Sequence, residues 1–362
     1  MTAAITHQKV LTKSDLIILI AGAFAVISAG IFYYFIDSPV IAFITSAAAV
    51  ALLAALVGRS VEQLGDRFGP GATGVLQSAL GNLPELFIGI FALRAGLTAV
   101  VKAALVGSIL SNLLLVLGLS FCVGGLKHGT QKLGSSRART IVTLMLLSVM
   151  AMAIPSLAHW IHSAAAPHEE TFSLIVAVVL LVLFLLYLPA SLKRGKAGID
   201  NETSADGKPR WPLWLAVGLL VIASALAAFV SDWFVTALEP SMKTLHISDE
   251  FAGLVIVAIA GNAIENVVGI QLAAKGRSEY AFSVIINSPL QIALVLAPVL
   301  VIISQVFGLA SFTLVFSPML LAAMFLAIVL AAFISFDGES NWLEGAALIA
   351  IYIIIATAFW WG

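Results

Sequence analysis

Two glutamates occupy the same five-residue motif at two distant points of an otherwise apolar chain. Gly-Asn-Leu-Pro-Glu at 81–85 recurs as Gly-Asn-Ala-Ile-Glu at 261–265, which places Glu85 and Glu265 180 residues apart. A carboxyl group inside an apolar segment is costly, so each glutamate is a candidate functional group. If they face one cavity, the two carboxylates form a hard-oxygen site that can bind cations or protons.

The 180-residue register continues beyond the motif. It aligns Ser108 with Ser288 and Ser111 with Gln291. Amide and hydroxyl oxygens at such positions can join a cation shell or orient the carboxylates. The candidate side chains of this kind are Asn82, Asn262, Ser108, Ser111, Asn112, Asn287, Ser288 and Gln291.

Helix-breaking residues lie beside both glutamates. Gly81, Pro84 and Gly261 interrupt regular helix, and backbone carbonyls freed at such breaks can add further oxygens. A site of this composition suits Ca²⁺, which takes about six to eight oxygen ligands. Burial and a neighbouring like charge favour the protonated carboxyl group, so Ca²⁺ and protons would exclude one another there. The alternative is a structural role, with each glutamate hydrogen-bonded between helices.

The composition requires a membrane environment. Of 362 residues, 61% are hydrophobic and 10% are charged, against about 25% charged in soluble domains. Apolar runs of about 20 residues, which span a bilayer as helices, follow one another through the chain, and they lack the alternation of barrel strands. We expect an all-α, polytopic membrane protein with the lipid bilayer as its partner. A net charge of −1 gives no electrostatic basis for binding nucleic acid.

Eleven transmembrane helices are predicted, separated by turn and breaker residues such as Gly58 and Pro155. Their expected ranges are 15–36, 39–57, 70–94, 98–122, 140–157, 171–190, 211–235, 250–274, 279–303, 313–335 and 342–361. The first range is longer than the apolar core of a signal peptide, which has about 7–15 residues, so we expect it to be retained.

The distribution of basic residues orients these helices. With the N-terminus in the cytoplasm, only Arg94, Lys102 and Lys243 of the 18 Lys and Arg fall on the outer side. The odd number of helices then places the C-terminus outside. We expect the membrane to be the bacterial inner membrane.

The register of the two motifs divides the chain into two halves. The predicted parts are an N-terminal tail and first helix (1–38), a first repeat (39–190), a cytoplasmic linker (191–210) and a second repeat (211–362). Each repeat would hold five helices, so the halves would cross the membrane in opposite senses. Such inverted repeats are typical of secondary transporters, whose substrate sites lie near the bilayer midplane.

Three further acidic residues, Glu62, Glu239 and Asp232, are weaker candidates for the cation pathway. They could form cation entrances at opposite sides of the membrane. They could equally be interfacial charges that pair with nearby Arg or Lys.

No feature indicates an enzyme or a resident cofactor. The zinc-binding motif HExxH is absent, and all six histidines lie outside the predicted span cores. His159, His162 and His168 share a loop with Glu169 and Glu170, but their spacing matches no closed metal motif. We expect a hydrated loop there.

The two motif regions resemble a known family of transporters. GNLPELFIGIFALRAG to VVKAALVGSILSNLLLVLG (81–118) and GNAIENVVGIQLAAKG to INSPLQIAL (261–294) look like the paired signatures of the Ca²⁺/cation–proton exchanger (CAX) family. The family belongs to the cation/Ca²⁺ exchanger superfamily. With the regions around Glu62 and Glu239, the resemblance covers about residues 55–300. One departure is Asn266, where the second signature usually has His.

The resemblance implies eleven spans, Ca²⁺ transport driven by protons, and two essential glutamates, which map onto Glu85 and Glu265. The polar helpers of the family map onto Asn82, Asn262, Ser108, Ser288 and Gln291. We expect a secondary antiporter that moves Ca²⁺ outward and H⁺ inward by alternating access. The alternatives are Na⁺/Ca²⁺ exchange or Na⁺ or K⁺ exchange for H⁺ on the same fold, and an ion channel also fits a polar midplane.

Overall fold

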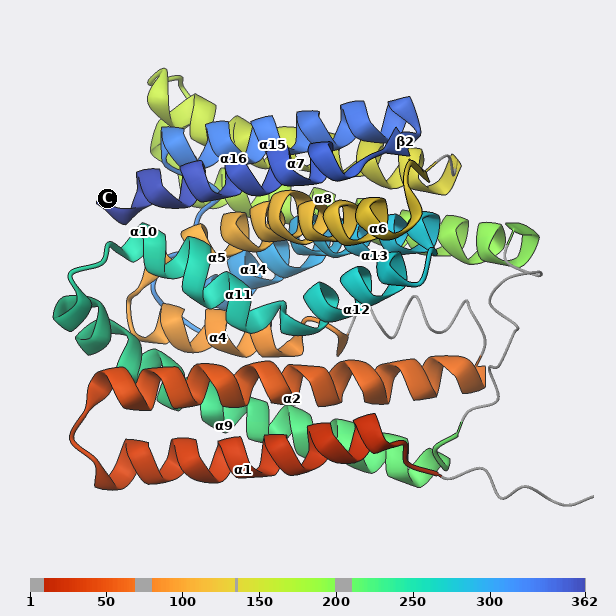
Figure 1. Cartoon of the computed structure of the whole chain (residues 1–362). Helices are drawn as coiled ribbons and strands as arrows, with labels where there is room; N and C mark the ends of the chain where they lie inside the picture. The colour runs from red at the N-terminus through yellow and green to blue at the C-terminus, as the bar shows by residue number, and fades with distance from the viewer. Residues whose placement is uncertain (1–9, 69–79, 134–135, 199–209, 362) are drawn as a thin grey trace, which may run out of the picture.

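The computed structural model describes residues 10–68, 80–133, 136–198 and 210–361; within these ranges, 65–68, 136–138, 190–198, 263–266 and 335 are described by their backbone alone. The described chain is mostly helical (Figure 1). Eight of its helices are long and apolar enough to cross a bilayer. The protein is an integral membrane protein.

The elements include three π-helical segments, η1, η3 and η4, which lie inside longer helices, and one 3-10 turn, η2. In chain order they are α1 (Lys13–Phe35), α2 (Pro39–Phe68), α4 (Leu83–Arg94), α5 (Thr98–Leu110), η1 (Ser111–Val116), α6 (Leu117–His128), β1 (Gln131–Lys132), α7 (Ser136–Trp160), η2 (Ala166–His168), α8 (Glu169–Gly198), α9 (Leu213–Leu245), α10 (Asp249–Phe251), η3 (Ala252–Val257), α11 (Ala258–Gly261), α12 (Ala263–Ala274), α13 (Ser278–Gln291), η4 (Ile292–Leu296), α14 (Ala297–Val306), α15 (Pro318–Asp337), β2 (Glu339–Ser340) and α16 (Trp342–Trp360). The two short strands pair antiparallel.

Several predicted helix ends are wrong because the helices continue through residues expected to break them. α2 runs through Gly58 and α7 runs through Pro155. In an apolar environment the backbone keeps its hydrogen bonds within the helix, and neighbouring helices compensate for a glycine or proline. α8 likewise extends to Gly198, into the segment 191–210 whose polar composition predicts a linker without regular structure.

Three long helices form a group at one side of the molecule (Figure 1). α2 and α9 pack against each other, and α1 packs against both. The ring of Trp233 in α9 stacks on Tyr33 in α1, with 5.7 Å between ring centroids. α4, α11 and α12 belong to the larger group of helices and contact this three-helix group.

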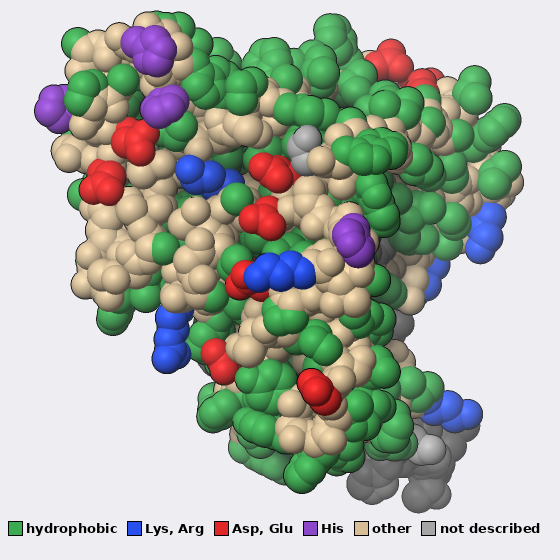
Figure 2. All heavy atoms as spheres, turned by 90° about the vertical axis from the view of Figure 1, so that its left-hand side faces the viewer, with side chains coloured by type: hydrophobic (Ala, Val, Ile, Leu, Met, Phe, Trp, Pro, Cys, Tyr) green, Lys and Arg blue, Asp and Glu red, His purple; other side chains and the backbone are tan. Residues whose placement is uncertain are grey.

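The molecule has two ends, which we call the C-terminal end and the N-terminal end. The C-terminal end holds the last turn of α16, the turn between α1 and α2, and the turn between α4 and α5; α1 begins at the N-terminal end (Figure 1). Figure 2 looks onto the C-terminal end and shows acidic side chains spread over it among few basic ones.

Both glutamate motifs interrupt a helix, as predicted. Gly81 and Asn82 form a turn before α4, and Asn262 separates α11 from α12. The backbone torsion angles at the two asparagines agree, with φ −95° and ψ 18° at Asn82 and φ −91° and ψ 19° at Asn262. Each break therefore places a glutamate in the first turn of a short helix, Glu85 in α4 and Glu265 in α12. The part of the predicted helix 70–94 before Leu80 lies outside the described residues.

α5 packs unusually close to η3. A Cβ atom added to Gly107 would overlap the carbonyl oxygen of Leu254, and one added to Gly253 would overlap the carbonyl oxygen of Val100. Small residues allow such approach of two backbones inside a membrane protein. The contact fixes α5 against the helix that leads to Asn262.

The chain between α14 and α15 has no regular secondary structure and is largely buried, so the predicted start of a helix at residue 313 is wrong. Residues 309–317 contain no helix, and Phe312 and Leu314 within this segment are fully buried. α15 starts only after Ser317, because the Ser317 hydroxyl accepts a hydrogen bond from the first turn and Pro318 occupies the first helical position.

Side chains from three helices satisfy the backbone of segment 309–317. The Lys102 Nζ atom in α5 donates to the Val315 carbonyl oxygen at 2.7 Å. The Ser156 Oγ atom in α7 donates to the Leu314 carbonyl oxygen at 3.0 Å, and the Ser173 Oγ atom in α8 accepts from the Leu314 amide at 3.0 Å. Non-helical backbone inside a membrane protein requires such partners, since lipid supplies none.

We predict that Lys102→Met lowers the melting temperature of the detergent-purified protein by several degrees. The substitution leaves a partly buried carbonyl without its charged donor, and such a hydrogen bond contributes about 1.5–3 kcal/mol. Lys243→Met is the matched control, because Lys243 is exposed and pairs with Glu239 at 2.7 Å; a surface pair contributes about 0–1 kcal/mol. Equal melting temperatures for the two variants would show that Lys102 does not hold the segment.

Candidate functional site

Glu85 lies against the second glycine-asparagine break. A Cβ atom added to Gly261 would lie 2.8 Å from the Glu85 Cγ atom and 3.1 Å from its Oε1 atom. The glycine therefore makes room for the carboxyl group of the other motif. In sequence the two residues are far apart, and the register alone indicates Gly261 only as a helix-breaking residue.

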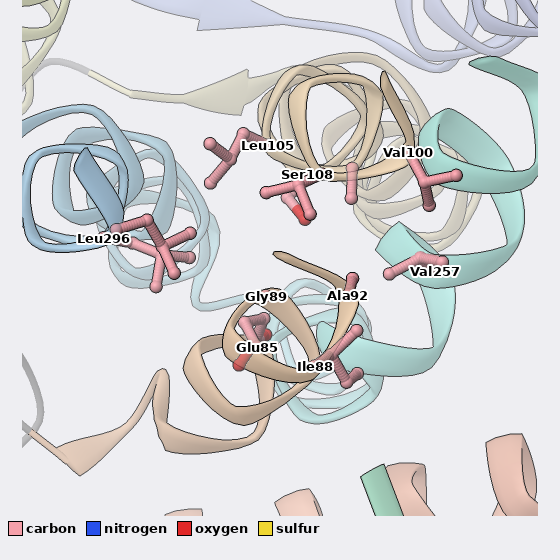
Figure 3. Close-up of a pocket in the computed structure, with 12 residues that line it drawn as sticks. Glu85, Ile88, Gly89, Ala92, Val100, Leu105, Ser108, Val257 and Leu296 are labelled. Atoms are coloured by element: carbon pink, nitrogen blue, oxygen red, sulfur yellow. The ribbon is translucent and has the colours of Figure 1, made fainter. Parts of the chain in front are cut away.

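A cavity of about 30 Å³ begins at Glu85 and Ser108 (Figure 3). It follows α4 and α5 toward the C-terminal end, as far as Ala92 and Val100, and Leu296 closes another side. Glu85 and Ser108 are the polar side chains among the described residues that line it. A space of this size accommodates a water molecule or a dehydrated cation.

Amide and hydroxyl groups form a buried network beside this cavity. The Asn262 Nδ2 atom donates to Ser108 Oγ at 2.7 Å. The Asn112 Nδ2 atom donates to Asn262 Oδ1 at 3.1 Å and lies 3.4 Å from Ser288 Oγ. These side chains come from α5, η1, the α11–α12 break and α13, so the network joins both predicted halves. All of them are buried.

A second link connects the first break to α13. The Asn82 Nδ2 atom donates to Gln291 Oε1 at 3.3 Å, between side chains that are both buried. Ser111 instead donates within its own helix, to the Ser108 carbonyl oxygen at 3.3 Å. Six of the seven principal residues predicted for the site thus meet in one region: Glu85, Asn82, Asn262, Ser108, Ser288 and Gln291.

The remaining candidates lie at the edge of this region or outside the described side chains. Glu265 and Asn266 occupy the first turn of α12, where only the backbone is described. Pro84 lies beside Glu85 in the first turn of α4 and is buried, and Asn287 is half-buried in α13.

The weaker acidic candidates lie apart from the network. Glu62 is exposed in α2 and pairs with Arg59 at 3.3 Å, and Glu239 is exposed in α9 and pairs with Lys243. Asp232 precedes Trp233, whose ring packs on α1. For Glu62 and Glu239, the interpretation as interfacial charges paired with a local cation agrees with this geometry.

Of the loop predicted from the histidines, His159 lies in the last turn of α7 and Glu169 begins α8, and His159 Nδ1 lies 3.1 Å from Glu169 Oε2. Among the residues that the structure describes, no group of three His, Cys, Asp or Glu side chains could hold a metal ion. The described side chains of the candidate site are the carboxyl group of Glu85 with hydroxyls and amides.

Sequence reasoning missed two features of this region. The cavity walls are apolar residues of α4 and α5, which no pattern distinguishes from ordinary core. The pairing of Asn112 with Asn262 was also not predicted, although a polar residue one turn after Ser108 in an apolar helix was a usable signal.

Two helices broken at buried asparagines, next to a carboxyl group inside an apolar helical bundle, define a class of protein. This is the architecture of secondary active transporters, in which broken helices meet around the transported ion.

Comparison with known proteins identifies the family. The sodium/calcium exchanger protein family matches residues 38–193 and 215–361. A Ca(2+)/H(+) antiporter of Aphanothece halophytica is 35% identical over 333 residues, covering 88% of this chain and 89% of the relative. The Ca(2+)/H(+) antiporter ChaA of Bacillus subtilis is 38% identical over 313 residues, covering 86% and 89%. The chain belongs to the sodium/calcium exchanger protein family.

Solved structures share its fold. The structure of native YfkE superposes with a TM-score of 0.81 at 34% identity, covering 95% of this chain and 99% of that chain. The H+/Ca2+ exchanger CAX superposes with a TM-score of 0.76 at 18% identity, covering 96% and 92%. The resemblance to the CAX family is confirmed.

Proposed function

We propose that this protein is a Ca²⁺/H⁺ antiporter that exchanges the two ions at one shared site. The observation that carries the proposal is the position of Glu85, whose carboxyl group lies against Gly261 and lines a cavity with Ser108. Hydroxyl and amide side chains of both predicted halves, which carry oxygen atoms that can bind a cation, lie close to this cavity. Such a set suits a hard cation.

Competition between Ca²⁺ and protons for two glutamates provides the coupling. When Glu85 and Glu265 are ionised, they supply negative charge to Ca²⁺, and when they are protonated they offer none. Each ion therefore leaves before the other binds, and transport in one direction drives transport in the other. No resident cofactor takes part, and Ca²⁺ is the substrate.

Two inverted repeats of five helices, 39–190 and 211–362, fit this mechanism. Both glycine-asparagine breaks have the same backbone geometry. The π-helical segment η1 (Ser111–Val116), shifted by 180 residues, falls on η4 (Ile292–Leu296). Together with α1, such repeats give eleven spans. Alternating access would expose the shared site to each side of the membrane in turn.

We place the C-terminal end outside and the N-terminus in the cytoplasm of a bacterium, with the protein in the inner membrane. The small number of basic side chains on the C-terminal end supports this orientation, since Lys and Arg favour the cytoplasmic side (Figure 2). The cavity at Glu85 extends toward that end. Ca²⁺ would then leave outward as H⁺ enters.

The names of the relatives support Ca²⁺ and H⁺ as the exchanged ions. Two relatives that cover most of the chain are named Ca(2+)/H(+) antiporter, and another, from Arabidopsis thaliana, is named vacuolar cation/proton exchanger 5.

Uptake of radioactive Ca²⁺ into proteoliposomes under an imposed pH gradient tests the proposal. We expect saturable uptake that follows the pH gradient, stops when a protonophore collapses it, and is unchanged by a Na⁺ gradient. Flux that neither saturates nor depends on the counter-ion would instead indicate a channel.

Na⁺-coupled exchange is the second candidate, because the matching family is described as sodium/calcium exchanger protein. Structures of the sodium-calcium exchanger NCX_Mj share the fold at a TM-score of 0.56. Ca²⁺ uptake that requires a Na⁺ gradient at equal pH on both sides would establish this candidate and reject proton coupling.

A further inference from the structure

The two asparagines of the glycine-asparagine breaks differ in whether a hydrogen bond engages the amide oxygen. Asn82 uses its amide nitrogen, which donates to Gln291 Oε1. Asn262 uses both ends of its amide, because its nitrogen donates to Ser108 Oγ and its oxygen accepts from Asn112 Nδ2. The backbone around the two asparagines is the same, so the difference comes from the side chains that reach them.

The sequence register explains the difference. Shifted by 180 residues, Asn112 falls on Ile292 and Ser111 falls on Gln291. The second half supplies its amide at Gln291, which bonds Asn82. The first half supplies its amide at Asn112, one residue further on in the register, and this amide bonds Asn262. Gln291 presents an oxygen to its asparagine, whereas Asn112 presents a nitrogen.

Backbone carbonyls fix the orientation of both amides in the second pair. Asn262 Nδ2 donates to the Ala258 carbonyl oxygen at 2.8 Å, and Asn112 Nδ2 donates to the Ser108 carbonyl oxygen at 2.9 Å. A carbonyl oxygen only accepts, so neither amide can be turned over without placing two acceptors together. The Asn262 oxygen therefore faces the Asn112 nitrogen.

The two asparagines consequently differ in the oxygen that they can offer. Asn262 and Asn112 are fully buried, and their bond occupies Asn262 Oδ1. In the described part of the chain, no hydrogen bond ends on Asn82 Oδ1. An amide oxygen engaged by a buried donor is a poorer cation ligand, because binding the cation first breaks that bond.

We propose that Asn112 is a positioning residue that makes the exchange site asymmetric. It holds the Asn262 amide with its nitrogen toward Ser108 and its oxygen withdrawn, so that Asn82 offers an oxygen to the transported cation and Asn262 does not. The inference rests on the proposed Ca²⁺/H⁺ exchange at this site. It assigns different roles to two residues that the sequence register makes equivalent.

Paired aspartate substitutions test the asymmetry. Asn82→Asp keeps an oxygen toward the cation and adds charge, so we expect an unchanged or lower KM for Ca²⁺ in proteoliposome uptake. Asn262→Asp places an acceptor against the Ala258 carbonyl oxygen, so we expect a KM at least about tenfold higher. Equal changes in the two variants would overturn the proposal.

Two substitutions of Asn112 separate its nitrogen from its oxygen. Asn112→Leu and Asn112→Asp both remove the donor to Asn262, so we expect both to raise the KM for Ca²⁺ to a similar degree, with a smaller change in the maximal rate. A wild-type KM in Asn112→Asp together with a raised KM in Asn112→Leu would show that Asn112 acts through its oxygen, against the proposal. Gln305→Leu, which removes an exposed amide bonded to the Glu170 carbonyl oxygen, is the control.

A binding measurement makes the result independent of transport. The rise in melting temperature that Ca²⁺ produces in the purified protein reports affinity directly. We expect it to persist in Asn82→Asp and to shrink in Asn262→Asp and in both Asn112 variants. Wild-type protein that takes up Ca²⁺ only with Na⁺ would reject the proposed function, while the comparison of the variants would still decide the asymmetry.

Discussion

Glu85→Gln is expected to abolish Ca²⁺ uptake driven by a pH gradient while leaving the protein folded. Glutamine keeps the size of the side chain and its contact with Gly261, but it carries no negative charge and releases no proton. A charged interaction of this kind contributes about 1.5–3 kcal/mol, and each 1.4 kcal/mol corresponds to about tenfold. The lost charge alone therefore lowers uptake by about 10- to 100-fold, and the lost proton exchange removes the remaining coupled uptake.

Glu265→Gln is expected to have the same effect, because the proposed mechanism requires both carboxyl groups to exchange protons for Ca²⁺. Initial rates of Ca²⁺ uptake in proteoliposomes, normalised to reconstituted protein, provide the measurement. Activity that survives in either variant would remove that glutamate from the site.

Glu62→Gln and Glu239→Gln are the matched controls for the loss of a carboxylate. Both residues are exposed and bonded to a basic residue in their own helix. Exposed pairs contribute about 0–1 kcal/mol, so these variants should transport within about a fewfold of the wild type. A large loss in either would instead favour its interpretation as a cation entrance.

Membrane helices could be predicted from the sequence because the bilayer fixes their composition and minimum length. The helix ends could not, and Gly58 shows the reason. A glycine breaks a helix when water competes for the backbone, whereas in α2 the surroundings are protein and lipid, and the helix continues.

Segment 309–317 shows a second limit. Its sequence is apolar enough for a helix, and its non-helical form depends on Lys102, Ser156 and Ser173 from three distant helices. No local pattern contains that information. The available signal was Lys102, a lysine inside an apolar span. The distribution of basic residues assigned Lys102 only to the outer side of the membrane and indicated no partner for it.

Much of the candidate site could be predicted because the repeated motif named its residues twice. Ser108, Ser288, Gln291 and both asparagines lie together in the structure. The pairing among them could not be predicted, since it depends on the amides of Gln291 and Asn112, which stand one residue apart in the register of the two halves. A register comparison treats the halves as equal, and the hydrogen bonds make them unequal.

Gly261→Ala is expected to reduce Ca²⁺ uptake by at least about tenfold without destabilising the protein. Gly261 has helical backbone geometry at the end of α11, so alanine fits its conformation and even favours helix by up to about 1 kcal/mol. The added Cβ atom would lie 2.8 Å from Glu85 Cγ, which is closer than two carbon atoms approach. Glu85 would therefore have to leave its position.

Gly218→Ala in α9 is the matched control, because no atom lies within 4 Å of the position that its Cβ atom would occupy. Overpacking typically costs about 1–3 kcal/mol, so a conventional steric effect of Gly261→Ala would lower the melting temperature together with activity. If Glu85 moves instead, uptake falls while the melting temperature stays near the wild-type value. Full uptake in Gly261→Ala would mean that exchange does not depend on the position of the Glu85 carboxyl group beside Gly261. The shared site would then lie elsewhere in the protein.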